Sequence, residues 1–211
     1  MNPEEQIIDG DTKEKATMKA NNYAFPLHII FKIGTIYNDL SVKDSKGQYI
    51  CYVKQKLFKL KDHVQIYTDD SKNNLAYEVR ADKIAGFNIN YAFKTADGKP
   101  LGKVARKGAR SIWKANYLIF DPNDTHKFTI REEKPWVKVL DSFVGFISGY
   151  VFNPTYIVKD TQDRPVARLV KEPSFFSRRF SLRALGEMKN GEDELILLSV
   201  VTMALNERRR G

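Results

Sequence analysis

The fold is decided by one stretch near the C-terminus, EDELILLSVVTMALNERRR, which spans residues 192–210. Acidic residues open it and arginines close it, which is the order of charges that complements a helix dipole. Residues 195–205 are apolar apart from Ser199 and Thr202, so a helix here must be buried on every side. Such a helix measures about 17 Å, too short for a bilayer. We therefore expect a helix over residues 193–207 enclosed by protein, with a central strand as the alternative for so short a run.

The rest of the chain alternates between apolar and polar residues with the period of β-strands. The clearest runs are residues 75–80, 87–93, 127–131 and 179–183. Turn-forming clusters separate these runs at residues 43–47, 69–74, 95–100 and 159–165. Short strands at this spacing predict a mainly β protein with a meandering antiparallel sheet, either closed or sandwiched. Strands that curl around the terminal helix satisfy both patterns, because the apolar face of the sheet then surrounds the helix.

A weak internal repeat accompanies the strands. In each copy a strand enters a turn that contains Asp, a second strand leaves it, and a basic stretch follows. The copies lie around residues 44–47, 97–100 and 160–165. Hairpins converge easily on such sequences, so the repeat is modest evidence of duplication.

The chain of 211 residues has room for one domain or two small ones. We interpret residues 1–22, which are rich in Glu, Lys, Asn and Asp, as a flexible tail, and residues 23–211 as a single domain. No stretch resembles a secretory signal or reaches the ~20 apolar residues of a membrane-spanning helix. We therefore expect a cytoplasmic protein that meets a membrane only at its periphery.

Several segments resemble the LURP-one-related family in their order and spacing. They are YVKQKLFKLKD (52–62), IYTD (66–69), AYEVR (76–80), NPTYIV (153–158), the run 166–180 with KEPSFF (171–176), and the apolar C-terminal helix. The resemblance covers roughly residues 45–206. It implies the fold of the tubby C-terminal superfamily, which also includes the phospholipid scramblases. That fold is a closed antiparallel β-barrel of about twelve strands around a central hydrophobic C-terminal helix.

The resemblance also implies a class of function. Tubby proteins bind phosphoinositides through basic residues, and scramblases are associated with membranes. A non-enzymatic binding module that recognises anionic phospholipid headgroups is therefore the first interpretation. The alternatives are a scramblase-like membrane-associated protein and a basic nucleic-acid-binding protein, in which Trp113 would stack on bases. The net charge of +9 suits an anionic partner in each case.

Basic residues gather in three stretches, the first of which holds Lys54, Lys56, Lys59 and Lys61. The candidate binding residues come from the other two: Lys103, Arg106, Lys107, Arg110, Lys171, Arg178, Arg179 and Arg183. Arginine suits phosphate because its planar donors bind two oxygens at once. On a strand, Arg179 and Arg183 share a face. The alternative is that each stretch is a solvated outer face of the barrel.

Catalytic and metal sites have little support in the sequence. Cys51 is the single cysteine, has no His nearby, and is expected to be a buried structural thiol. Residues 121–132 imitate a calcium-binding loop, but His126 stands where that loop needs glycine. A hydrolase or transferase would need a concave site with perturbed acids, for which the sequence offers no candidate. We therefore expect no enzyme, no metal site and no cofactor.

Overall fold

The computed structural model describes residues 23–32, 37–56, 63–83, 89–107, 116–133, 155–172 and 177–208. Within these residues lie twelve strands and one helix, α2 (Glu192–Arg208). The strands are β1 (Leu27–Lys32), β2 (Tyr37–Lys43), β3 (Tyr49–Lys56), β4 (His63–Tyr67), β5 (Leu75–Lys83), β6 (Ile89–Thr95), β7 (Pro100–Lys107), β8 (Asn116–Phe120), β9 (His126–Glu132), β10 (Thr155–Asp160), β11 (Pro165–Glu172) and β12 (Ser177–Ala184). The tail predicted over residues 1–22 lies outside the described residues.

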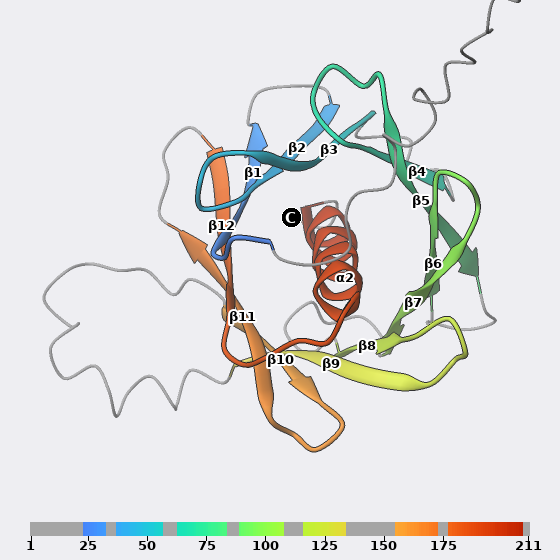
Figure 1. Ribbon diagram of the computed structural model, residues 1–211, viewed down its shortest axis with the longest axis vertical. Helices are drawn as coiled ribbons and strands as arrows, with labels where there is room; N and C mark the ends of the chain where they lie inside the picture. Colours follow the sequence, from blue (N-terminus) through green and yellow to red (C-terminus); the bar gives the residue numbers. More distant parts are fainter. Residues whose placement is uncertain are drawn as a thin grey trace, which may run out of the picture.

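The strands form a closed antiparallel barrel (Figure 1). Each strand pairs with its neighbours in the sequence, and β1 pairs with β12 to close the ring. At this seam Leu27 lies opposite Leu182, and Phe31 lies opposite Arg178. Closure removes the free edges that an open sheet would expose. The predicted barrel around a C-terminal helix is thereby confirmed.

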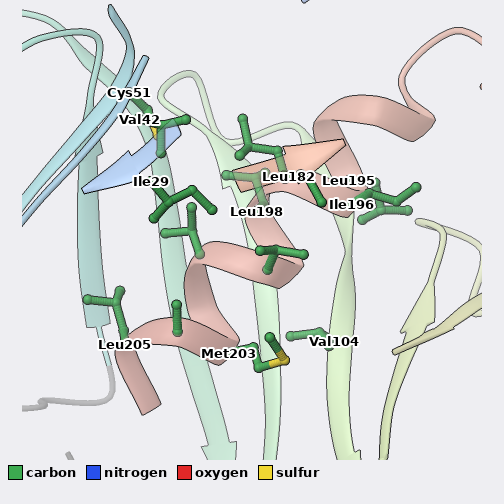
Figure 2. Packing of buried hydrophobic residues seen from close by; sticks show 14 of the residues in the cluster. Ile29, Val42, Cys51, Val104, Leu182, Leu195, Ile196, Leu198, Met203 and Leu205 are labelled. Carbon is green, nitrogen blue, oxygen red and sulfur yellow. The ribbon is translucent and has the colours of Figure 1, made fainter. Parts of the chain in front are cut away.

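Helix α2 lies inside the barrel, where the ring of strands surrounds it (Figure 1). Every residue from Leu195 to Asn206 is buried, so all sides of the helix contact protein. Figure 2 shows these side chains beside inward-facing residues of strands that are far apart in the sequence, such as Ile29 and Val104. Ser199 is one of the two polar residues in the apolar run. Its Oγ donates a hydrogen bond to the carbonyl oxygen of Leu195 (2.8 Å), so this hydroxyl group has a partner within the helix.

Five hairpin turns at one end of the barrel share a backbone design. In each, the N–H of the fourth residue donates to the carbonyl of the first, and the fourth residue has a positive φ. The first and fourth residues are Asp44 and Gly47, Asp69 and Lys72, Thr95 and Gly98, Asp121 and Asp124, and Asp160 and Asp163. The aspartates at the first position also accept backbone N–H groups at Oδ1. The repeat seen in the sequence is therefore a recurring turn, present also at Asp69 and Asp121.

The two ends of the barrel differ in their relation to α2. The five turns lie at the end where α2 begins, which we call the turn end. We call the opposite end, where α2 ends, the exit end. There, Tyr91 Oη of β6 donates a hydrogen bond to Asn206 Oδ1 in the last turns of α2 (2.9 Å).

Candidate functional site

A row of arginines crosses the outer face of strands β9 to β12. Arg131 lies opposite Ile157, and Ile157 lies opposite Arg168. Arg168 in turn lies opposite Arg183. Inward-facing neighbours of these arginines are buried: Ile130, Leu169 and Leu182. Because side chains alternate along a strand, Arg131, Arg168 and Arg183 point outward; we call them the outer arginine row.

The outer arginine row carries more positive than negative charge. Arg168 Nη2 lies 3.1 Å from Glu133 Oε1. This ion pair neutralises one of the three arginines of the row. Arg131 and Arg183 are exposed, and neither has an ion pair within the described part of the chain. Arg168 and Arg183 are directly opposed, and like charges in that position repel. An anion that contacts both guanidinium groups would relieve this repulsion.

Lys103 is one of the predicted binding residues, but the structure places it apart from the outer arginine row. Its Nζ lies 2.7 Å from Asp124 Oδ1, in a hairpin at the turn end. The same ammonium group lies over the ring of Phe120, 5.5 Å from its centroid. Lys107 ends β7, and Arg110 lies outside the described residues. Within the described residues, the members of the second basic stretch therefore do not form one surface.

The third predicted stretch is divided between the two faces of the sheet. Lys171 lies opposite Phe180, and Arg178 lies opposite Phe31, so both occupy inward-facing positions near the exit end. Arg179 lies opposite Glu172 on the outer face, as alternation requires. Arg178 and Arg179 are both exposed. Arg179 and Arg183 share the outer face, as predicted.

Arg106 lies on the inner side of the barrel, although the sequence suggested an outer basic face. It lies two residues after the buried Val104 on β7, so the two side chains share the inner face, and it lies opposite Tyr117 of β8 and Ile89 of β6. Only 4% of its surface is exposed. Its Nε and Nη2 atoms are buried without a hydrogen-bond partner among the described residues. The period of the strand, not the local density of basic residues, decides on which side this arginine lies.

A sequence profile of the LURP-one-related family matches residues 49–203, which is most of the chain. The chain belongs to this family. Among solved structures it is similar to the X-ray structure of a protein from Arabidopsis thaliana, with 13% identity and a TM-score of 0.48. That match covers 88% of this chain and 92% of the Arabidopsis chain. A comparison with curated proteins gave no match.

In this LURP-one-related protein, a partly buried polar network joins the barrel to the start of α2. Tyr77 Oη donates a hydrogen bond to Glu194 Oε1, and Tyr23 is hydrogen-bonded to Tyr77. Burial is the main reason that the pKa of Glu194 lies above its ordinary value. Burial likewise raises the pKa of Tyr77, and the carboxyl of Glu194 adds to this rise. Local sequence patterns do not reveal this network, because its residues lie far apart in the chain.

The structure of this family member also bears on the other sequence interpretations. Cys51 is fully buried, and burial raises the pKa of its thiol to about 12, as expected for a structural cysteine. The segment that imitates a calcium loop is instead a hairpin turn followed by β9. Within the described ranges, no group of three His, Cys, Asp or Glu residues could hold a metal ion. No helix in those ranges has the length and apolar character needed to cross a bilayer.

Proposed function

We propose that this protein is a non-enzymatic binding module whose outer arginine row contacts anionic phospholipid headgroups. The LURP-one-related family is not known as a family of enzymes, and the closed barrel supplies a rigid support for a binding surface. The observation that carries the proposal is the direct opposition of Arg168 and Arg183 in a row that also contains Arg131.

The geometry of the row suits a surface that presents many phosphate groups. Adjacent strands lie about 4.8 Å apart, so the row places three guanidinium groups across four neighbouring strands. Each guanidinium donates in a planar fork that matches two phosphate oxygens. On a membrane surface each basic residue contributes about 1 kcal/mol of attraction, and salt screens it. Glu133 reduces the contribution of Arg168.

The other predicted binding residues extend this proposal toward the exit end. Arg178 and Arg179 are exposed at the start of β12, and Lys171 lies near the end of β11. Lys103, Lys107 and Arg110 remain predictions for a second contact. Lys103 would have to exchange its ion pair with Asp124 for a phosphate. We therefore place the outer arginine row first and these residues second.

Co-sedimentation with vesicles tests the proposal. We expect binding to vesicles that contain a phosphoinositide, weaker binding to pure phosphatidylcholine, and a steep loss of affinity with added salt. The triple variant R131A/R168A/R183A should bind about 100-fold more weakly, because it loses about 3 kcal/mol of attraction. The matched control K46A/K72A/K94A removes the same charge at exposed positions nearer the turn end and should retain most of the affinity.

Two results would overturn this assignment. If both triple variants lose affinity equally, attraction depends on net charge and the row is not the contact surface. If the wild type does not bind anionic vesicles at physiological salt, the ligand is of another class. An oligonucleotide titration on the same proteins identifies the nucleic-acid alternative, for which the logarithm of the binding constant would fall linearly with the logarithm of salt concentration.

A further inference from the structure

Arg106 is an unusual residue for the inside of a protein. Arginine is rarely buried without a partner, because removing its charge from water carries a large free-energy penalty. Nevertheless Arg106 is 4% exposed, and its Nε and Nη2 atoms have no hydrogen-bond partner in the described part of the chain. Buried donors that have no partner among the described residues call for a ligand or another source of compensation.

Among the described residues, the neighbours of Arg106 do not supply an anion. The residues opposite it on the neighbouring strands are Ile89 and Tyr117, and Val104 precedes it on the inner face of β7. Tyr91, opposite Val104, directs its hydroxyl to Asn206 of α2. No described acid forms an ion pair with Arg106. The C-terminal end of α2 offers a favourable dipole, but a dipole does not replace the hydrogen bonds that Nε and Nη2 lack.

The other charged residues at inward-facing positions near the exit end are mostly cations. Lys171 and Arg178 lie there on the strands across the barrel from β7. Glu132 is the acid in this set; it lies opposite Tyr156 on β10 and has an interaction of its own. The electrostatic potential at this end therefore favours an anion.

We propose that Arg106 is the principal ligand of an oxyanion site on the inner side of the barrel at the exit end, and that the anion is a phosphate group, free or carried by a headgroup. The two nitrogens without partners, Nε and Nη2, form one edge of the guanidinium plane. That edge is the one that binds two oxygens of a phosphate or carboxylate at once. The site is separate from the outer arginine row, because the two lie on opposite faces of the sheet.

Thermal unfolding of the full chain in sodium phosphate and in sodium chloride, at equal ionic strength and pH, tests this site. We expect the Tm of the wild type to rise in a saturable manner, by about 5 °C or more at 100 times the Kd. R106M should show no rise with phosphate. In chloride its Tm should equal or exceed that of the wild type, since an apolar residue of similar volume replaces a buried, unpaired charge. R106K keeps the charge without the fork and should bind phosphate about tenfold more weakly.

Variants of the outer arginine row distinguish the Arg106 site from the vesicle-binding surface. The outer-row variant R131A/R168A/R183A should keep the full phosphate-dependent rise in Tm even where it loses vesicle binding. A wild type with equal Tm values in phosphate and chloride overturns the site, and so does a rise that persists in R106M. If R106M does not fold, calorimetric titration of wild type and R106K with inorganic phosphate decides the question, because equal affinities would contradict the role of the fork.

The same titration distinguishes the two sources of the phosphate group. A soluble inositol phosphate that binds at least tenfold more tightly than inorganic phosphate, with the gain lost in R106K, indicates a headgroup. Equal affinities for the two probes indicate free phosphate. Absence of binding by both probes contradicts the site.

Discussion

The ionisable groups near the two ends of α2 differ in whether they have a partner. At the turn end, Glu194 lies in the first turn of the helix and accepts a hydrogen bond from Tyr77. At the exit end, Arg106 lies near the last turns, and its Nε and Nη2 atoms have no partner within the described residues. Both charges have the sign that the helix dipole favours. The ionisable group at the turn end therefore has a partner within the protein, whereas the two donors at the exit end are left for the anion that we propose.

The largest effect is expected from a change that disrupts the turn end. A Cβ added at Gly102 would lie 2.3 Å from the carbonyl oxygen of Phe120 and 2.9 Å from Leu195 Cδ1 of α2, and φ at this glycine is +132°. We therefore expect G102A to lower the free energy of unfolding by about 3 kcal/mol or more, measured by urea denaturation.

The matched control for this change is G98A. Gly98 has a φ of +88° and nothing within 4 Å of an added Cβ, so only its backbone conformation opposes a side chain. Its loss should be about 1–2 kcal/mol. Equal losses in G98A and G102A would show that the close approach of β7 to the start of α2 is unimportant.

A smaller effect compares the tyrosines that join the barrel to the two ends of α2. Y77F removes the donor to a carboxyl, whereas Y91F removes the donor to the neutral amide of Asn206. Unsatisfied charged groups are more costly than neutral ones, so we expect losses of about 2 kcal/mol for Y77F and about 1 kcal/mol for Y91F. The opposite order in chemical denaturation would mean that the exit end holds α2 more firmly.

The smallest effect is a pH dependence at the turn end. The pKa of Glu194 is raised in the folded state, mainly by burial, so the folded protein binds its proton more tightly than the unfolded chain. The free energy of unfolding should therefore be lowered by this group as the pH rises from the ordinary carboxyl pKa through the raised one. E194Q should lack this decrease. Parallel stability curves for wild type and E194Q from pH 4 to pH 8 would contradict it.

Local patterns predicted the elements of the fold, namely antiparallel strands and a buried C-terminal helix, whereas the closure of the barrel and the number of strands were implied by the family resemblance. The helix follows from an apolar run with acids before it and arginines after it, and the strands follow from alternation. The turns follow from Asp residues. The repeat recognised in the sequence did not include the copies that begin at Asp69 and Asp121. Each of these features depends on residues within a few positions of one another, so no knowledge of register is needed.

The binding residues could be predicted only in part, because they depend on register between strands. Arg131 comes into line with Arg168 and Arg183 only through the pairing of four strands. In the sequence it is followed by two glutamates, so it does not stand out as part of a basic stretch. Arg106 was identified as basic, but its inward position follows from the phase of β7 relative to Tyr117. Tyr77 and Glu194 are 117 residues apart, and no local pattern relates them.

The position of α2 after the last strand has a consequence for synthesis of the protein. During synthesis on the ribosome, all twelve described strands emerge before the helix on which their inner faces pack. The ring cannot close until β12 has been made, because β12 pairs with β1. The inner face of the nascent sheet therefore has no helix to pack on until α2 has been synthesised. A chain truncated before residue 192 would lack α2, and the apolar inner face of its strands would then be exposed to water, so we expect such a chain to aggregate.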